Sequence, residues 1–504
     1  MQTEFDIVII GSGLGGLVCG AVLGMEGYRV CILEKNRQLG GCLQTFARDK
    51  VLFDSGVHYI GGLDKGQNLY QVFKYLGLMD KLNLERMDEA GFDRIAFLED
   101  GKEYAMAQGY DRFIEKLAAD FPGEEENIRN YCDKIREICA RFPMYHLQSG
   151  GGLVEKSAVL DIDTRTYIES ITSNPRLQEV LAGNNFLYAG EPYKTPFYVH
   201  ALVLNSYIES SWKCVDGGSQ ITKWLAKRIR DNGGVIRNHA EVIRIAEENE
   251  RISYVELKDG SRVRGKHFIS NIHPQQTLAM TETTMLRAAY RNRINRLNNT
   301  ISSFCVNAVM KPGAFPYYRH NYYIHDTDGV WGAIKCDKGK WPQSCCVFFS
   351  ASSRSTAHTE ALSILAYMPY EEVARWQDTF NTDSEPADRG ADYEQFKKEK
   401  AEQLIAFVER KFPGLRGQIQ SFTCTSPLSY RDYIGTADGS MYGIAKDFRD
   451  PMGTYLPSRT RVPNLYLTGQ NLLLHGILGV TISALATCTE LVDSNTLIEK
   501  IRNA

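Results

Sequence analysis

The chain of 504 residues lacks the excess of positive charge that binding to nucleic acid requires. Its 58 lysine and arginine residues are outnumbered by 61 aspartate and glutamate residues, which gives a formal net charge of −3. The basic residues are also spread along the chain, whereas nucleic-acid-binding proteins gather them into a patch that follows the phosphates. The sequence therefore predicts no nucleic-acid partner. The 43% hydrophobic and 24% charged residues are typical of a globular protein with a substantial core.

The twelve cysteines lack the spacing of a disulfide framework or of a zinc site. Cys345 and Cys346 are the only close pair, and adjacent cysteines have a poor geometry for a structural disulfide. The first residues lack the basic segment of a signal peptide. We therefore expect free thiols, no bound metal and a cytoplasmic protein.

One segment, residues 471–488, is long and apolar enough to suggest a membrane span, which takes about 20 predominantly apolar residues. Polar residues interrupt the run, and two glycines, Gly476 and Gly479, lie near its start. We therefore expect a buried helix that begins at a glycine turn.

The N-terminal residues follow the order of a dinucleotide-binding unit. Residues 5–10 form an apolar run that predicts a strand buried on both faces. This run leads into the glycine-rich turn Gly11-Ser12-Gly13-Leu14-Gly15-Gly16. A helical pattern extends from there to Gly27, and a second predicted strand ends at Glu34. In such a unit Gly11 allows the tight turn, Gly13 lets the backbone approach a pyrophosphate, and Gly16 lets the helix pack on the strand.

The predicted contacts to the dinucleotide come from the start of this helix and from Glu34. Backbone amides at a helix N-terminus bind phosphate oxygens, and each such hydrogen bond contributes roughly 1.5–3 kcal/mol, more than the roughly 0.3–1 kcal/mol of the helix dipole. Glu34 is placed to accept hydrogen bonds from the ribose hydroxyls of an adenosine, and its charge would repel a 2′-phosphate. A glycine-rich turn in an α/β domain that binds nothing is the alternative.

The glycine-rich stretch after the second strand favours FAD over NAD. Its first part, residues 34–45, includes Lys35, Gly40, Gly41 and Thr45. Its second part, residues 53–62, includes His58 and Tyr59. An NAD-dependent dehydrogenase ordinarily continues directly into another βαβ unit, whereas this excursion is of the kind that wraps an extended flavin.

These and later motifs resemble those of the phytoene desaturase and carotenoid isomerase superfamily of flavoproteins. The shared runs are residues 53–62 (FDSGVHYIGG), 430–432, 439–443, 464–471 and 476–479. The resemblance covers essentially the whole chain and is strongest to the retinol saturase branch. Residues 214–219 keep the turn of the family's Pro-x-Gly-Gly motif without its proline. Gly469-Gln470 replaces a Gly-Asp pair, and the glutamine still offers a hydrogen bond to a ribityl or phosphate oxygen.

The resemblance implies an α/β fold of the two-dinucleotide-binding-domain type found in amine oxidases and phytoene desaturases, with an α+β substrate domain. The Rossmann-like FAD domain is then expected to comprise residues 1–65, 213–282 and 424–504, and the substrate domain residues 66–212 and 283–423. Helical spacing of apolar residues over 124–142 and 396–412 predicts amphipathic helices in the second domain.

The resemblance also assigns roles to residues far from the first motif. Val242 would contact the adenine through its backbone. The last apolar helix would direct its N-terminal amides at the pyrimidine edge of the flavin, through Gly476, Gly479, Val480 and Thr481. A helix that only packs in the core is the alternative.

Residues 285–297 predict a basic amphipathic helix. Its arginines alternate with apolar residues: Arg287, Arg291, Arg293 and Arg296 with Leu286, Tyr290, Ile294 and Leu297. One interpretation is a patch that rests on anionic lipid at the inner membrane surface and admits an apolar substrate. A solvated surface helix is the other, and the sequence leaves both open.

Candidates for proton transfer are His58, His475 and Tyr430. His58 lies in the flavin-wrapping run, His475 directly precedes the last helix, and Tyr430 lies in a motif expected near the flavin ring. Imidazole and phenol groups are suitable general acids, and a purely structural role is the alternative. Cys42 has no partner cysteine nearby, so we expect neither a redox thiol nor a covalent flavin link.

The resemblance implies an FAD-dependent oxidoreductase that saturates a carbon–carbon double bond in a lipophilic conjugated polyene or isoprenoid, such as a retinoid or carotenoid. The flavin carries the hydride chemistry, and a side chain or water supplies the proton. Desaturation, redox-neutral isomerisation, and prenyl binding without catalysis are the alternatives. Only one dinucleotide fingerprint is present, so either NAD(P)H binds transiently without its own Rossmann unit or an electron-donor protein supplies the electrons.

Overall fold

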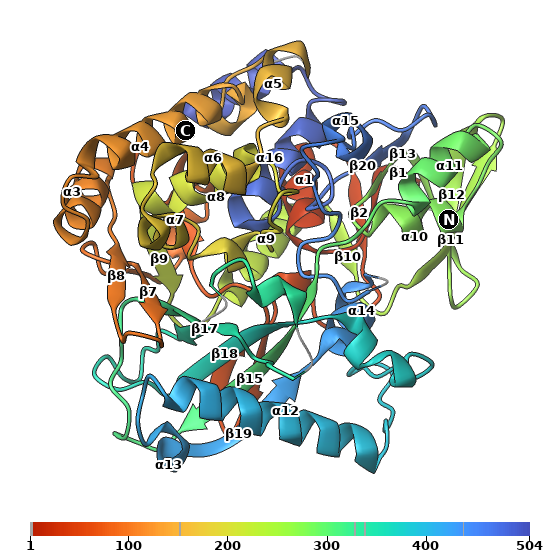
Figure 1. Ribbon diagram of the computed structural model, residues 1–504. Coiled ribbons are helices and arrows are strands. Elements are labelled where there is room, and N and C mark those ends of the chain that lie inside the picture. The colour runs from red at the N-terminus through yellow and green to blue at the C-terminus, as the bar shows by residue number, and fades with distance from the viewer. Residues whose placement is uncertain (1–3, 151–152, 327–328, 337–338, 437) are drawn as a thin grey trace.

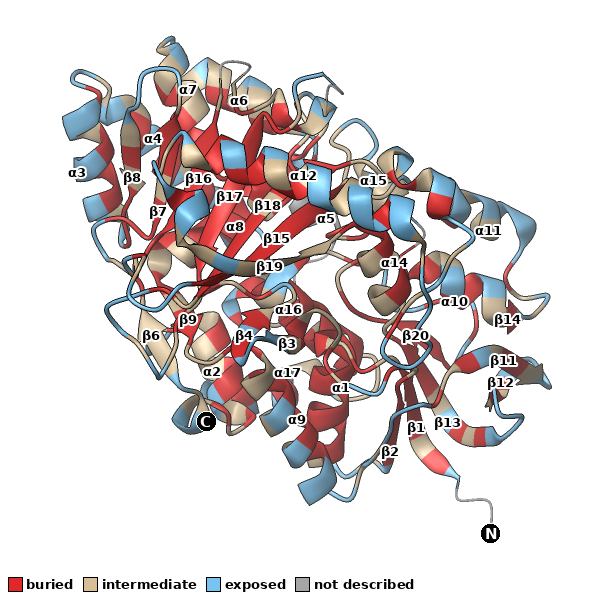
Figure 2. Cartoon of the chain, turned by 90° about the horizontal axis from the view of Figure 1, so that it is seen from below, coloured by how far each residue is buried: buried red, intermediate tan, exposed pale blue. Residues whose placement is uncertain are grey.

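Two large β-sheets set the architecture of the protein in the computed structural model, which describes residues 4–150, 153–326, 329–336, 339–436 and 438–504 (Figure 1). The first sheet has the strand order β10-β2-β1-β13-β12-β11-β14, with β20 paired to β13. The second sheet has the order β19-β15-β18-β17-β16-β7-β8. Helices cover both, so the strands of each sheet are largely buried (Figure 2).

The strands of the first sheet come from three distant stretches of the chain. They are β1 (Phe5–Ile10), β2 (Val30–Leu33), β10 (Val235–Arg237), β11 (Val242–Glu248), β12 (Arg251–Leu257), β13 (Arg262–Ser270), β14 (Thr281–Glu282) and β20 (Leu465–Leu467). β10, β2, β1, β13 and β20 pair in parallel, and β11, β12 and β13 form an antiparallel meander. Both faces of β1 and β2 are buried, which explains their nearly continuous apolar sequences.

Three helices pack together on one face of this sheet. Helix α1 (Leu14–Met25) contacts α9 (Ser219–Asp231) and α16 (Gly476–Cys488). Helix α16 is buried along most of its length and begins at Gly476, whose φ is +73°. The expectation of a buried helix at a glycine turn is thus confirmed. Within the described ranges, no helix has both the length and the apolar character needed to cross a membrane.

The second sheet has one face on helix α12 (Ala391–Glu409) and the other toward the first sheet and the remaining helices (Figure 1). Its strands are β7 (Asp93–Phe97), β8 (Glu103–Met106), β15 (Ser302–Met310), β16 (Asn321–His325), β17 (Ser344–Phe349), β18 (Ala361–Met368) and β19 (Ile419–Thr425). β16 and β7 are parallel and the other neighbours antiparallel. Side chains alternate between the faces, so Tyr322 packs in the cluster under α12 and Tyr323 in the cluster on the opposite side.

A helical layer completes the second part of the chain. Its helices are α2 (Asn68–Tyr75), α3 (Tyr110–Asp120), α4 (Glu125–Ala140), α5 (Leu153–Leu160), α6 (Thr164–Ile171), α7 (Pro175–Leu181) and α8 (Phe197–Glu209). Figure 1 shows most of them gathered on the side of the second sheet opposite α12. The amphipathic helices predicted over 124–142 and 396–412 correspond to α4 and α12.

Small elements connect these layers. The short strands are β3 (Thr45–Arg48), β4 (Val51–Asp54), β5 (Ile60–Gly61), β6 (Leu84–Arg86) and β9 (Ser211–Cys214). The remaining α-helices are α10 (Pro274–Met280), α11 (Ala288–Asn295), α13 (Leu415–Gln418), α14 (Pro427–Ile434), α15 (Pro451–Thr454) and α17 (Ser494–Arg502).

The predicted basic helix is shorter than its sequence pattern, because α11 covers only the middle of it. The guanidinium of Arg291 donates hydrogen bonds to the carbonyl oxygens of Leu278 (2.5 Å) and Thr281 (2.6 Å). Arg293 donates to the carbonyl oxygen of Gly453 (2.9 Å). At least two of the four arginines therefore brace backbone segments next to the first sheet.

Candidate functional site

A cavity of about 660 Å³ extends from the first sheet to the second. At one end it is bordered by the residues that follow β1, β2 and β13, where the carboxyl ends of parallel strands meet. Open α/β sheets bind ligands at this edge. At the other end the wall is formed by β16, β17 and β18 of the second sheet.

The glycine turn after β1 packs around the side chain of Asn271, which follows β13. A Cβ atom on Gly13 would lie 2.8 Å from Asn271 Nδ2, and one on Gly15 would collide with Asn271 Oδ1. A Cβ atom on Gly16 would collide with the carbonyl oxygen of Gly11. Glycine is therefore required at these positions by close approach of neighbouring atoms, and Gly13, Leu14 and Gly15 at the start of α1 border the cavity.

Glu34 lies in the cavity wall and also holds the turn. Its Oε2 accepts hydrogen bonds from the backbone N–H of Ser12 (2.9 Å) and from Ser12 Oγ (2.6 Å). Its Oε1 accepts a hydrogen bond from the backbone N–H of Asn36 (2.9 Å). These bonds fix the carboxylate at the end of β2 and leave it some capacity to accept a further hydrogen bond from a ligand.

Most of the residues predicted to bind the cofactor line this cavity. They are Gly11, Gly13, Leu14, Gly15, Glu34, Lys35, Gly40, Gly41, His58, Val242, Gly469, Gln470, Gly476 and Val480. The other predicted residues do not line it: Ser12, Gly16, Thr45, Tyr59, Gly479 and Thr481. Thr45 Oγ1 donates to Ser219 Oγ (3.0 Å), and Thr481 Oγ1 donates to the Ile477 carbonyl within α16 (2.7 Å).

His58 reaches the cavity as a neutral ring. It stacks on Phe348 with the ring centroids 4.1 Å apart and 3° between the planes. Burial, with a smaller contribution from the charge of Lys213, lowers the pKa of His58 to about 4. At neutral pH this imidazole is uncharged, so it has no imidazolium proton to donate.

The other two candidates for proton transfer differ in position. His475 lines a smaller space beside Tyr442, and its Nε2 donates to the carbonyl oxygen of Leu187 (2.8 Å). Burial lowers the pKa of His475 to about 4. Tyr430 lines the main cavity and accepts a hydrogen bond from Ser303 Oγ (3.0 Å), and burial raises its pKa.

The turn that precedes α16 is fixed by a buried lysine that sequence reasoning missed. Lys446 Nζ donates to the carbonyl oxygens of Thr454 (3.0 Å), Asn471 (2.9 Å) and Leu472 (2.8 Å). Burial lowers the pKa of this ammonium to about 7. A lone lysine in a loop carries no sequence signal for such a role.

The wall on the second sheet is apolar and aromatic, and strand register explains its composition. Tyr323 of β16 pairs with Cys346 of β17, and Cys346 pairs with Leu365 of β18. Paired residues share a face, so all three side chains border the cavity. Phe348 lies two residues beyond Cys346 on the same face. Sequence reasoning missed this wall, because β16 and β17 are buried on both faces and their sequences do not alternate between polar and apolar residues.

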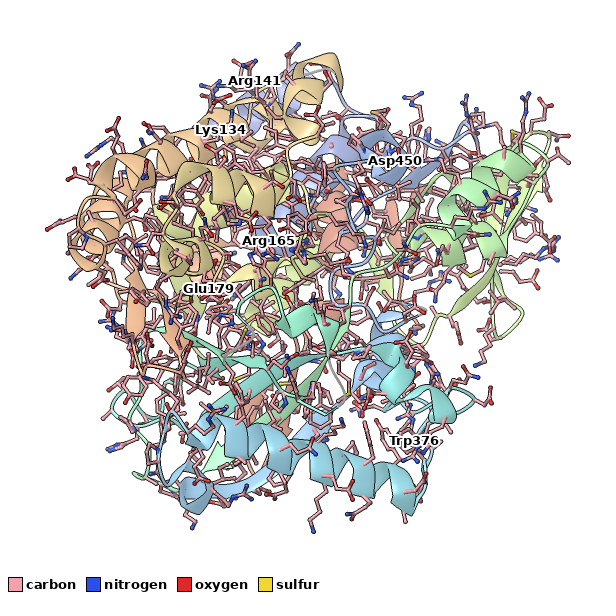
Figure 3. The ribbon with its side chains drawn as sticks, viewed as in Figure 1. Lys134, Arg141, Arg165, Glu179, Trp376 and Asp450 are labelled. Atoms are coloured by element: carbon pink, nitrogen blue, oxygen red, sulfur yellow. The ribbon has the colours of Figure 1, made fainter. Side chains whose placement is uncertain are left out.

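A loop between β18 and α12 borders the cavity. Phe380 of this loop lines the cavity, and the backbone N–H of Asn381 donates to Asp432 of α14 (2.9 Å). Arg389 forms an ion pair with the same carboxylate, and both side chains are almost fully buried. Trp376, labelled in Figure 3, anchors the start of the loop by donating from Nε1 to Asp392 (3.1 Å).

No cluster of three or more His, Cys, Asp or Glu side chains suited to a metal ion occurs among the residues that the structure describes. None of the twelve cysteines forms a disulfide; nine are buried, and Cys42, Cys336 and Cys424 are half-buried. Cys42 borders the cavity, and burial raises the pKa of its thiol to about 11. A thiol in that state is a poor nucleophile at neutral pH.

Comparisons with known proteins agree with this geometry. Residues 9–76 match the family of NAD(P)-binding Rossmann-like domains. Over 98% of its length the chain is 27% identical to the all-trans-retinol 13,14-reductase of Rattus norvegicus, 86% of which is covered. Over 87% of its length it is 24% identical to the chloroplastic prolycopene isomerase of Daucus carota, 72% of which is covered.

A solved structure shares the whole fold. Wild-type putrescine oxidase bound to putrescine matches 97% of this chain with 99% of its own, at a TM-score of 0.65 and 13% identity. The predicted fold class, a Rossmann-like unit with a second α+β part as in amine oxidases, is confirmed. The predicted resemblance to the phytoene desaturase and carotenoid isomerase superfamily is confirmed as well.

Proposed function

We propose that this relative of retinol 13,14-reductases and prolycopene isomerases is an FAD-dependent oxidoreductase that saturates a carbon–carbon double bond of a lipophilic conjugated polyene, such as a retinoid or carotenoid. One observation carries the proposal. A single cavity joins a dinucleotide-type glycine turn to a chamber with aromatic and aliphatic walls. The two halves suit a flavin nucleotide and an apolar substrate that meet within it.

The residues at the first sheet fit the nucleotide part of FAD. Gly13 and Gly15 line the cavity, which suits contact between backbone and phosphate, and the lack of a Cβ atom on either makes room for the Asn271 side chain. Glu34 at the end of β2 is placed for the ribose, and Val242 for the adenine. Negative charge at the ribose position disfavours a 2′-phosphate, so the proposal selects FAD over a cofactor derived from NADP.

The residues at the start of α16 fit the isoalloxazine part. Gly476 lines the cavity, and the first amides of a helix of 13 residues stabilise negative charge near them. Gly469 and Gln470 border the same region. When bound, the flavin supplies the hydride, and the protein positions the substrate and handles the proton.

The walls of the inner chamber favour an apolar, conjugated substrate. Phe348, Leu365 and Met441 offer apolar contacts, and aromatic faces pack well against an extended π-system. We assign the nucleotide to residues 1–65, 213–282 and 424–504, and the substrate to residues 66–212 and 283–423. The proposal includes a cytoplasmic location, with substrate delivered from lipid, and leaves NAD(P)H and a donor protein as rival sources of electrons.

The test is an anaerobic half-reaction. Purified protein should contain FAD, which is reduced chemically and then mixed with all-trans-retinol, a carotenoid or an unsaturated fatty acid. We expect one of the polyenes to reoxidise the flavin stoichiometrically and to leave as a product with two more hydrogens. An isomerised product of unchanged mass, formed while the flavin stays reduced, would favour an isomerase. A colourless protein that stays colourless with added FAD would exclude both.

A further inference from the structure

Three buried polar side chains form a hydrogen-bonded chain that ends at the inner chamber. The hydroxyl of Tyr59 donates to Asp93 Oδ2 at 2.8 Å and lies 2.7 Å from the hydroxyl of Tyr323. Asp93 and Tyr323 have no exposed surface, and Tyr59 is also buried. Of the three, only Tyr323 borders the cavity. The chain thus leads from a carboxyl in the interior to the place where we expect the substrate.

The parallel pairing of β7 with β16 builds this arrangement. It places Asp93 opposite Asn321, whose Nδ2 donates to Asp93 Oδ1 at 3.1 Å. Tyr323 follows two residues later and therefore points from the same face of the sheet. Tyr59 directly precedes β5, and its hydroxyl connects the carboxyl of Asp93 with the hydroxyl of Tyr323.

The surroundings of Asp93 favour its protonated form. The groups that face it are Tyr59, Tyr207, Tyr323, Asn184, Asn321, Cys346 and Lys213. Lys213 is the other group that titrates in this range, because burial lowers the pKa of its ammonium to about 7. Its Nζ donates to the carbonyl oxygens of Tyr318 (3.1 Å) and Phe349 (2.8 Å). Burial raises the pKa of Asp93 to about 7, against the opposing effects of its hydrogen bonds and of Lys213. A large fraction of this carboxyl is therefore a neutral acid at physiological pH.

We propose that Tyr323 is the catalytic proton donor for the reduction, and that Tyr59 and Asp93 restore its proton after each transfer. This inference rests on the proposed function. One carbon of the double bond takes the hydride, and the electron pair released on its neighbour forms a C–H bond with the phenolic proton of Tyr323. In the neutral acid the proton sits on Asp93 Oδ2, which then donates to Tyr59, and Tyr59 donates to Tyr323; the carboxylate form reverses both bonds. The phenolate of Tyr323 takes the proton of Tyr59, and Tyr59 takes that of Asp93. Asp93 remains as a carboxylate until solvent protonates it again.

Removal of one hydroxyl tests the donor. Tyr323→Phe keeps the ring and the FAD site, and we expect substrate to reoxidise the reduced flavin about 100-fold more slowly or worse, with substrate affinity unchanged. Tyr322→Phe is the matched control, because Tyr322 directly precedes Tyr323 in β16 and packs on the opposite face, toward α12. Equal rates for wild type and Tyr323→Phe would overturn the proposal.

The pH dependence tests the role of Asp93. In the wild type, the rate of flavin reoxidation should fall as the pH rises through about 7, because the acid form of Asp93 is lost. Asp93→Asn should be slow and should lack this fall. A merely structural Asp93 would change stability and leave the shape of the pH profile intact, which would contradict the relay.

A spectroscopic measurement needs no substrate. The infrared difference spectrum of wild type minus Asp93→Asn should contain a carboxylic-acid C=O band at pH 6 that disappears as the pH rises through 7. An ionised Asp93 across that range would overturn the relay. If no polyene reoxidises the flavin of the wild type, the proposed function fails, and the infrared titration still reports separately on the carboxyl.

Discussion

At the scale of single residues, the geometry of the site depends on the missing Cβ atoms of two glycines as well as on side chains. Gly13 and Gly15 leave room for Asn271, so the start of α1 can border the cavity. Glu34 holds the same turn through Ser12. An alanine methyl group at this turn would collide with Asn271 or with the backbone, so one of them would have to move.

The first prediction concerns that methyl group. Gly15→Ala should purify with little or no FAD, because the new Cβ would collide with Asn271 Oδ1 and displace the turn proposed to bind the pyrophosphate. The measurement is the ratio of flavin absorbance to protein, followed by titration with FAD. Gly417→Ala is the matched control, since a Cβ there meets no atom within 4 Å. Full FAD content in Gly15→Ala would place the nucleotide elsewhere.

The second prediction concerns the buried ammonium of Lys446. Lys446→Met leaves three buried carbonyl oxygens without their donor, which should lower the free energy of unfolding by about 3 kcal/mol or more. The turn before α16 loosens with it, so FAD should also dissociate faster. Denaturant unfolding and flavin release measure the two effects. Lys227→Met, which removes an exposed ion pair with Asp231, should change stability by less than about 1 kcal/mol.

Single residues also show where sequence reasoning ended. The Gly11-to-Gly16 turn and Glu34 were recognisable because the backbone of the turn and the shape of a dinucleotide together determine their spacing. Tyr323 was not, because Tyr322 beside it is equally aromatic and only the position of α12 decides which of them turns inward. His58 was predicted as an acid from its position along the chain, whereas its low pKa follows from three-dimensional burial.

At the scale of elements, the loop before α12 is joined to helix α14 by hydrogen bonds and ion pairs beside the cavity. Asp432 accepts from the backbone of Asn381 and pairs with Arg389 and Arg431. The carboxylate is fully buried and Arg389 is 5% exposed, so without Arg389 the carboxylate would depend on Arg431 alone in an environment without water.

The third prediction follows from this tie. Arg389→Met should destabilise the protein by about 2 kcal/mol, because the buried Asp432 carboxylate loses one of its two guanidinium partners and keeps only Arg431. Arg410→Met removes an exposed pair with Asp326 and should cost less than about 1 kcal/mol. Chemical denaturation compares the two. Similar losses for both variants would show that the buried pair contributes no more than a surface one.

Elements were predicted unevenly. The order of β1, α1 and β2 could be read from the apolar runs and the glycine turn, and α4 and α12 from helical spacing. The basic helix was predicted too long, since α11 spans only Ala288–Asn295. Its arginines look solvent-facing in sequence, yet Arg291 and Arg293 donate to carbonyl groups in the structure. Long-range partners of that kind leave no local pattern.

At the scale of the whole molecule, burial of ionisable groups couples folding to pH. Burial lowers the pKa of five histidines to about 3 or 4: His58, His200, His320, His325 and His475. Each stays neutral in the folded state while the unfolded chain takes up a proton near pH 6.5. Their contribution to stability is present above that pH and is lost as the pH falls toward 4.

The fourth prediction is a fall in stability from pH 7 to pH 5. Each histidine contributes a loss of about 2 kcal/mol at pH 5, and Asp54 and Asp93, whose pKa values burial raises to about 7, offset part of the total. Unfolding in denaturant at the two pH values measures the slope. His200→Gln should be less stable at pH 7 and less sensitive to acid, whereas an unchanged slope would contradict the burial argument.

The first sheet also has a consequence for how the protein is made. Strand β20 and helix α16 complete a sheet and a cavity that begin at β1, so residues 465–488 must be synthesised before the two ends can meet. A ribosome adds about 5–20 residues per second. While the intervening chain is made, β13 and α1 lack their partners β20 and α16. Under the proposed function, a flavin can therefore bind only after residues 465–488 have been synthesised.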